Sequence, residues 1–381
     1  MPAKDIAVVL SGGGAYAAYE VGAMRAILHG ETVATGRRPI DPGIYCGTSA
    51  GALNAAVMVE TGSVDHLERI WREDFAGATG TSSNGVLRIR LNPFSYGDLS
   101  SFRLDPVRPF SEFAGDAISI AESLIRRGAS FVNSPKGTAA TTAFELVDVA
   151  ALVCTDPLAE TLRRTVNLER VHNSARRLQI VATNWTTGEI RVFGNEHFST
   201  DLGYAAIHAS TAIPGIFPPV TIDGSIYVDG GLVANSPLKP AIGNGASEIH
   251  IVYIDPNVSH IPISRMQGTL EALDRSLAIA LANIANRDID NAHSINQGIA
   301  ARRAREVGNS EIITKTESRL DHHESNKYRE LTIHRYHPKE DLGGGLGVLN
   351  FSRDAIERLI DKGYEDTLRH DCVRSGCVLP A

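Results

Sequence analysis

The 381-residue chain contains few cysteines and no long apolar run. Four cysteines are too few for a disulfide scaffold at this length. Cys372 and Cys377 are close enough to pair under oxidising conditions, but no His or Cys cluster beside them in the sequence suggests a metal site. No stretch approaches the roughly 18 apolar residues of a membrane-spanning helix. We therefore expect no metal, no cofactor and no membrane span.

Concentrated positive charge is also missing. The net charge is −7 and the arginine pairs are scattered along the chain, which argues against nucleic acid as a partner. The apolar run Ile6 to Leu10 is too short for the core of a signal peptide and is typical of a first strand. We expect a cytoplasmic protein, with transient peripheral contact with a membrane left open.

Hydrophobic residues make up 43% of the chain, enough to bury a large core. Apolar, β-branched runs alternate with helical patterns, which predicts an α/β protein with a mostly parallel sheet. We expect one domain over residues 1–381. Within it, residues 77–149 are rich in Gly, Ser, Thr and Pro and predict an irregular, lid-like insertion, and residues 265–370 predict a C-terminal helical region.

A glycine-rich loop follows the first predicted strand. Ser11-Gly12-Gly13-Gly14 leads into an amphipathic helix over Tyr16 to Leu28, an arrangement that favours anion binding by backbone N–H groups. A dinucleotide site would need a glycine where Ala17 stands, and a phosphate-binding P-loop would need Gly-Lys-Ser/Thr. An oxyanion hole needs only backbone donors, and an ordinary tight turn is the remaining alternative.

The central motif is Gly47-Thr48-Ser49-Ala50-Gly51, between the apolar run at Ile44 and an Ala-rich helix over Ala50 to Glu60. A sharp strand-to-helix turn is tolerated there because Gly47 and Gly51 lack a Cβ. The turn would present the Ser49 hydroxyl near the positive end of the following helix. Ser49 is thus the candidate nucleophile, against the alternative of an ordinary Gly-rich βα turn.

A serine nucleophile needs a base. Asp223-Gly224 has a complete explanation as the turn of a hairpin, whereas Asp229, before Gly230 and Gly231, closes a strand with no hairpin return. An apolar surrounding, such as the Pro-rich segment Ala209 to Pro219, would raise the pKa of Asp229 and make it a base. The alternative is a Ser-His-Asp triad using His208, His250 or His260.

Three ordered motifs together resemble the patatin-like phospholipases, a family of lipid acyl hydrolases: Gly12-Gly13-Gly14, Gly47 to Gly51, and Asp229-Gly230-Gly231. The resemblance spans about Ile6 to Leu368, apart from the insertion. It implies a three-layer α/β/α fold and an acyl-lipid substrate. It also implies that Ser49 is the nucleophile, Asp229 the base of a dyad, and Gly12, Gly13, Gly14 and Ala15 the oxyanion hole.

The chain departs from the family pattern after the glycines. The family usually has a basic residue and then glycine, and this chain has Tyr16 and Ala17. Alanine disfavours positive φ, and tyrosine removes a positive charge, so the expected consequence is altered or lower activity. A lipid-binding or regulatory protein without turnover is therefore a second hypothesis.

The remaining expectations concern the C-terminal half and the insertion. The run Glu248 to Ile254 predicts a last buried strand, and Phe351 to Leu368 predicts a closing amphipathic helix. The polar region 309–347 predicts a solvated loop. Its histidines could bind a metal, but without a carboxylate pattern we expect them on the surface: His322, His323, His334 and His337. Within the insertion, Asp116 to Arg127 predicts a short amphipathic helix that packs on the main domain.

Overall fold

The computed structural model describes residues 2–76, 88–89, 94–95, 103–104, 153–154, 156–214, 216–254, 269–306, 329–343 and 345–380. Most of the predicted insertion, including the expected helix at 116–127, lies outside the described residues. The described residues within it form the short strands β3 (Arg88–Ile89), β4 (Phe94–Ser95) and β5 (Arg103–Leu104). Strand β4 pairs with β5, and β3 pairs with β6 (Val153–Cys154), which lies beyond the insertion.

An eight-stranded sheet forms the centre of the molecule, in the order β12-β11-β1-β2-β7-β10-β9 with β8 also paired to β7. Neighbouring strands from β12 to β7 are parallel, and β8, β9 and β10 are antiparallel to their neighbours. The parallel strands are β1 (Ala3–Leu10), β2 (Pro42–Thr48), β7 (Arg177–Asn184), β11 (Glu248–Val252) and β12 (Thr332–Tyr336). The antiparallel ones are β8 (Ile190–Gly194), β9 (Val220–Ile222) and β10 (Ser225–Asp229).

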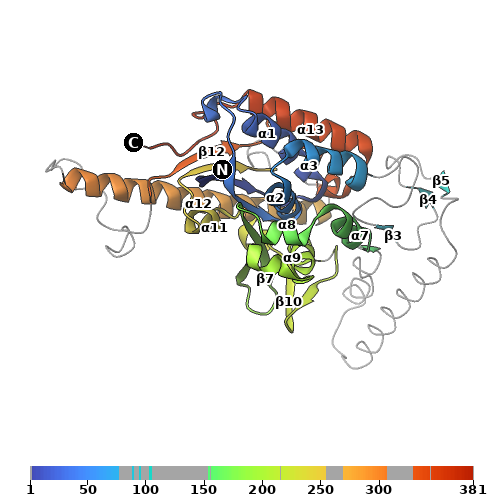
Figure 1. Cartoon of the computed structure of the whole chain (residues 1–381). Coiled ribbons are helices and arrows are strands. Elements are labelled where there is room, and N and C mark those ends of the chain that lie inside the picture. Colours follow the sequence, from blue (N-terminus) through green and yellow to red (C-terminus); the bar gives the residue numbers. More distant parts are fainter. Residues whose placement is uncertain are drawn as a thin grey trace.

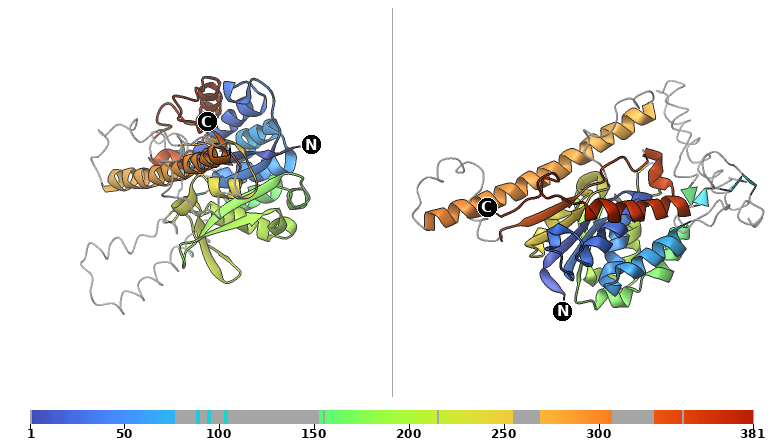
Figure 2. Two further views of the ribbon diagram at one scale, coloured as in Figure 1. Left: turned by 90° about the vertical axis from the view of Figure 1, so that its left-hand side faces the viewer. Right: turned by 90° about the horizontal axis from the view of Figure 1, so that it is seen from above.

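Helices cover both faces of this sheet (Figures 1 and 2). Alternate residues of a buried strand point to opposite faces, so Val8 belongs to one core cluster and Val9 to the other. The first cluster packs under α1 (Ala17–Leu28), α2 (Ala50–Thr61), α3 (Val64–Ile70) and α13 (Arg353–Leu368). The second packs under α11 (Leu238–Gly243) and α12 (Thr269–Glu306). The predicted α/β/α fold is confirmed.

Local sequence signals predicted several elements well. Helix α9 (Leu202–Ser210) lies between β8 and β9 in the chain. The β9–β10 hairpin turns through Asp223 and Gly224 with positive φ values of 52° and 77°, as a type I′ turn requires. Helix α3 continues as a π-helical segment, η3 (Trp71–Phe75). The shorter helices α7 (Asp156–Thr165), α8 (Leu168–His172) and α10 (Gly231–Ala234) complete the part used below.

Two expectations for the C-terminal half are wrong. Strand β11 is not the last strand, because β12 follows it along the chain and pairs with it in parallel. His334 lies on β12 and is buried, not on a surface loop. It also lies beside Cys372 and Cys377 together with His370, so these cysteines do have histidine neighbours. The edge strand Thr332–Tyr336 was missed because its polar residues do not form the apolar run expected of a buried strand. The contact of His334 with a cysteine 38 residues away was missed because no spacing rule links them.

None of the helices among the described residues is long and apolar enough to cross a membrane.

Helices α1 and α13 cross at close range through two glycines. A Cβ on Gly22 would lie 1.8 Å from the carbonyl oxygen of Ile360, and a Cβ on Gly363 would lie 1.9 Å from that of Tyr19. Each glycine therefore faces the backbone of the other helix, and no side-chain rotation could relieve a clash. The helices pack at a distance that only glycine permits at these two points.

We predict that Gly22→Ala and Gly363→Ala each lower the free energy of unfolding by about 1–3 kcal/mol, since the helices must separate. This loss outweighs the gain of roughly 0.5–1 kcal/mol that alanine brings inside a helix. The matched control is Gly243→Ala, because a Cβ there meets nothing within 4 Å and φ is not positive. Urea unfolding compares the three variants, and a wild-type midpoint for Gly22→Ala would contradict the prediction.

Candidate active site

Ser49 occupies a strained turn between β2 and α2. Its backbone has φ 55° and ψ −129°, and among the described non-glycine residues only Arg37 and Asp223 also have positive φ. Such a conformation costs about 1–3 kcal/mol. A Cβ on Gly47 would lie 2.2 Å from the carbonyl oxygen of Gly51, and one on Gly51 would lie 2.7 Å from that of Leu10. Both glycines are thus required by the turn, as the sequence predicted.

A second serine holds the turn in place. The Ser49 N–H donates to the Ser210 hydroxyl at 2.9 Å, and that hydroxyl donates to the carbonyl oxygen of Val181 on β7 at 2.6 Å. Ser210 is fully buried at the end of α9. Sequence reasoning treated the segment from Ala209 only as an apolar surrounding for Asp229 and missed this contact. A polar residue in an otherwise apolar helix end was the available signal.

Asp229 ends β10, and its side chain points toward Ser49. Its N–H donates to the carbonyl oxygen of Ala212 at 2.9 Å, and its Oδ1 accepts from the Gly231 N–H at 2.7 Å. Burial raises the pKa of Asp229 to about 6, while hydrogen bonding from the Ser49 side chain and the Gly231 backbone acts in the opposite direction. The structure therefore brings the side chains of Ser49 and Asp229 together. Gly230 and Gly231 begin helix α10 directly after Asp229.

The glycine loop after β1 lies against this pair. A Cβ on Gly12 would approach the Ser49 Cβ to 2.9 Å. The Gly12 N–H is already engaged, because it lies 3.1 Å from both the backbone oxygen and the side-chain Oδ1 of Asn235. Among the hydrogen bonds of the described residues, none uses the N–H of Gly13 or Gly14. Ala15 is fully buried in the core. Asn235 was not singled out in the sequence, which has no signal for its role.

The unusual Tyr16-Ala17 pair fits the loop without strain. Ala17 has φ −65° and begins α1, so its position does not need the positive φ that glycine would allow. The loop's positive φ falls on Gly14, at 54°. Tyr16 is buried, and its hydroxyl packs closely on Gly347, because a Cβ added to Gly347 would lie only 1.9 Å from the hydroxyl oxygen. An aromatic contact with the segment before α13 therefore replaces the family's positive charge.

A buried carboxyl group, that of Glu20, holds the start of the glycine loop at Ser11. Glu20 is fully buried on α1, and its Oε2 accepts from the Asn54 side chain at 2.9 Å. Asn54 in turn accepts from the Trp71 indole N–H at 2.7 Å. Burial raises the pKa of Glu20 well above its usual value, opposed by hydrogen bonds from Asn54 and the Ser11 backbone. The network ties α1, α2 and η3 to the end of β1. A single Glu within the apolar run of α1 was its only sequence signal.

An apolar cavity opens beside Ser49. Trp71 and Phe351 stack within its wall, with ring centroids 6.2 Å apart and planes 11° apart. Phe75 meets Trp71 edge to face at 5.1 Å. The described residues that line the cavity are Gly14, Ser49, Ala50, Leu53, Trp71, Phe75, Leu158, Thr211, Ile213, Phe217, Val348, Leu349 and Phe351. This lining suits a hydrocarbon chain whose end reaches the Ser49 hydroxyl.

Of the alternative histidine bases, neither His208 nor His250 is among the described residues that line this cavity. His250 lies within β11, where its ring nitrogens contact the Tyr336 hydroxyl at 3.0 Å and Glu248 at 3.1 Å. His208 lies on α9, and His260 lies outside the described residues. The described residues around the cavity thus place an aspartate, and no histidine, next to Ser49.

The raised pKa of Asp229 predicts an effect on stability. In the folded protein its carboxyl group ionises at about pH 6, above the usual value of 3.8. The ionised form is therefore disfavoured by folding at every pH above about 6, and this penalty fades as the pH falls toward the unfolded value. We predict that Asp229→Asn stabilises the fold at pH 8 by up to about 3 kcal/mol.

Thermal unfolding between pH 8 and pH 4 measures this effect. The gain should shrink as the pH is lowered through 6. Asp223→Asn, on the exposed turn of the same hairpin, is the control and should show no such gain. A variant Asp229→Asn with wild-type stability at both ends of the range would contradict the environment described for this carboxyl group.

Comparison with known proteins identifies the family of this chain. The model of the family described as patatin-like phospholipase matches residues 8–242. Among solved structures, VipD from Legionella pneumophila is 15% identical with a TM-score of 0.38, over 96% of this chain and 66% of the VipD chain. This chain thus spans about two thirds of the length of that protein. A search of curated proteins gave no match. With more than half of its length matched by the family model, the chain belongs to the patatin-like phospholipase family.

Proposed function

We propose that the protein is a serine lipid acyl hydrolase that cleaves carboxylic esters of phospholipids or related acyl lipids through Ser49 and Asp229. Membership of the patatin-like phospholipase family supports lipid acyl hydrolysis as the general activity. The observation that carries the finer proposal is the hydrogen-bonding contact between Ser49 and a buried Asp229, beside an apolar cavity.

In the proposed mechanism, Asp229 takes the proton of the Ser49 hydroxyl as the serine oxygen attacks the ester carbonyl. Negative charge then develops on the carbonyl oxygen, next to the glycine loop and the N-terminus of α2. The N–H groups of Gly13, Gly14 and Ala15 are the proposed donors to this oxygen. Gly12 belongs to the same loop, and its own N–H donates to Asn235, which holds the loop in position. Collapse of the intermediate transfers the proton to the leaving alcohol. Water activated by Asp229 then releases the fatty acid.

The environment of Asp229 suits the role of a base. An aspartate of ordinary pKa is a weak acceptor for a serine proton, because its pKa lies far below that of the serine hydroxyl. A pKa of about 6 reduces this difference and still leaves Asp229 ionised at pH 7. The aliphatic and aromatic lining of the cavity gives an acyl chain a place to bind. Because such substrates reside in membranes, transient peripheral contact with a bilayer is part of the proposal, as is a cytoplasmic location.

Hydrolysis of p-nitrophenyl esters of medium-chain acids tests the dyad. Ser49→Ala and Asp229→Asn should each reduce kcat/KM by at least about a thousandfold, because nucleophile and base act as one unit. Asp223→Asn is the matched control and should retain activity, since Asp223 lies at an exposed turn and pairs with Arg191. Activity should survive EDTA. An Asp229→Asn variant with kcat/KM close to that of the wild type would overturn the assignment of the base.

The same assay separates the two alternatives. A lipid-binding protein without turnover would show no hydrolysis and no labelling of Ser49 by a fluorophosphonate. A Ser-His-Asp enzyme would lose about a thousandfold on substitution of one histidine, so His208→Ala, His250→Gln and His260→Ala are made separately. All three should remain active if Asp229 is the base.

The pH dependence gives a further prediction. Asp229 must be ionised to accept a proton, so log kcat/KM should fall with a slope near one as the pH drops below about 6 and reach a plateau above it. Stopped assays between pH 4.5 and 8 on a soluble ester would measure this profile. A plateau extending down to pH 4.5 would show that a group of lower pKa controls the reaction.

A further inference from the structure

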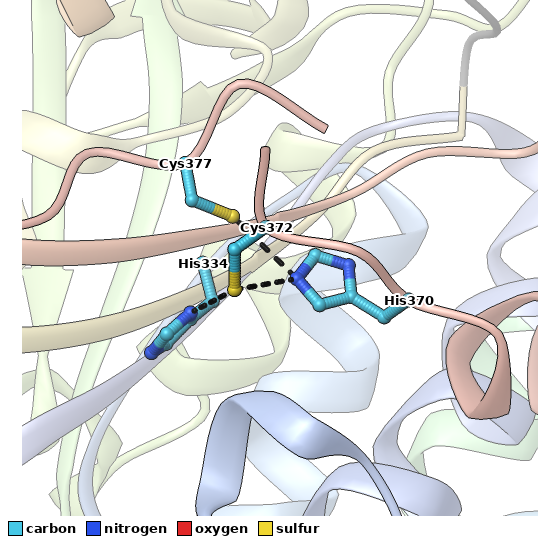
Figure 3. A group of neighbouring side chains, drawn as sticks. All are labelled: His334, His370, Cys372 and Cys377. Carbon is cyan, nitrogen blue, oxygen red and sulfur yellow. Dashed lines mark hydrogen bonds between the residues drawn. The ribbon is translucent and has the colours of Figure 1, made fainter. Parts of the chain in front are cut away.

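A second group of chemically active side chains lies far along the chain from Ser49. His334 on β12 meets His370, Cys372 and Cys377, which follow α13 (Figure 3). One ligand atom from each of the four residues lies within 4.8 Å of all the others. The two histidines are buried, with exposed fractions of 6% and 8%, and both cysteines are free thiols. The mechanism proposed above uses none of these residues.

The separations between sulfur and nitrogen match the edges of a metal tetrahedron. Cys372 Sγ lies 3.6 Å from His334 Nδ1 and 3.5 Å from His370 Nε2, and Cys377 Sγ lies 3.5 Å from the same His370 nitrogen. Zn–S bonds of about 2.3 Å and Zn–N bonds of about 2.0–2.1 Å at tetrahedral angles put S and N about 3.6 Å apart. These three separations therefore already match those of a zinc coordination shell, and the other distances among the four atoms are no more than 4.8 Å.

The chain between the cysteines is folded to bring their sulfurs together. Asp371 Oδ1 accepts from the N–H groups of Val373 and Arg374, at 2.9 and 3.0 Å. The Cys377 N–H donates to the carbonyl oxygen of Cys372 at 2.9 Å, which closes the turn. Four residues separate the two cysteines, within the range of spacings usual for zinc-binding pairs.

Neighbouring groups orient the proposed ligands. The Arg335 N–H donates to Cys377 Sγ at 3.3 Å, a contact that favours a thiolate. The Ser375 hydroxyl lies 3.4 Å from His370 Nδ1, which leaves the other ring nitrogen directed at the sulfurs. The His334 ring stacks on His250, with centroids 5.1 Å apart. Contacts of this kind around ligands are typical of metal sites.

We propose that His334, His370, Cys372 and Cys377 bind one Zn²⁺ ion as a structural site. Two thiolates and two imidazoles are a ligand set that zinc prefers, whereas calcium and magnesium prefer oxygen ligands. Four protein ligands complete the tetrahedron and leave no position for a reactive water. Strands β11 and β1 separate β12 from β2, the strand that Ser49 follows, so the proposed zinc site lies apart from the proposed site of ester hydrolysis.

The ion would fasten the C-terminal segment to the sheet. Val378 exchanges two backbone hydrogen bonds with Ile333, at 2.7 and 2.9 Å, directly after the last cysteine. His334 supplies a ligand from β12, and the other three ligands come from residues 370–377. Zinc binding therefore links the edge strand to the chain that follows α13, and it adds stability to the folded state alone.

Metal analysis of the full chain, purified under reducing conditions without chelator, tests the proposal. We expect about one zinc per chain. After removal of zinc, added Co²⁺ should give the visible bands of tetrahedral cobalt and a thiolate-to-cobalt charge-transfer band. Cys372→Ser, Cys377→Ser, His334→Asn and His370→Asn should each weaken metal binding by at least tenfold. The matched controls are Cys46→Ala, on β2, and His66→Asn, on α3, and both should keep the metal.

Limited proteolysis gives a second readout. Removal of zinc should make residues 370–380 susceptible to cleavage, and restored zinc should protect them. Failure of the reduced wild-type protein to bind zinc or cobalt would overturn the proposal, as would full zinc content in a Cys372→Ser/Cys377→Ser double variant. A disulfide between the two cysteines in protein kept reduced would also overturn it. Cobalt titration of the wild type decides the matter even if a variant fails to fold.

Discussion

The strained backbone at Ser49 is the constraint on which the rest of the site depends. A positive φ at a serine persists only where the surroundings hold it, and here Ser210 anchors the N–H to β7 while two glycines let α2 approach β2 and β1. The same turn directs the hydroxyl toward Asp229 and the apolar cavity. The proposed function therefore begins with a backbone conformation and not with an unusual side chain.

Burial has a different consequence at each carboxyl group near that turn. Asp229 is buried with few partners, so its pKa rises into the range useful for proton transfer. Burial raises the pKa of Glu20 as well, and the contacts of Glu20 with Asn54 and the Ser11 backbone join α1, α2 and the loop after β1. The first arrangement suits chemistry and the second suits support. Both place polar groups where an apolar core would otherwise be, which fixes the relative positions of α1, α2 and β1.

Short-range signals predicted much of the molecule. The glycines around Ser49, the Asp-Gly turn and the apolar strands all act through local geometry, so Ser49, Asp229 and the order of layers could be read from the sequence. Contacts between distant segments could not. Ser210, Asn235 and Glu20 act on residues far away in the chain, and the partners of Cys372 and Cys377 come from an edge strand disguised by polar residues. No periodicity or spacing encodes such pairs.

The crossing of α1 and α13 has a consequence for how the protein forms. These helices pack through Gly22 and Gly363, so α1 cannot complete its packing until α13, far later in the chain, has been synthesised. Until α13 emerges from the ribosome, the face of α1 that packs on α13 stays exposed. Contacts of such long sequence separation slow folding and prolong exposure of apolar surface. During synthesis, the nascent chain should therefore depend on chaperones until α13 is complete.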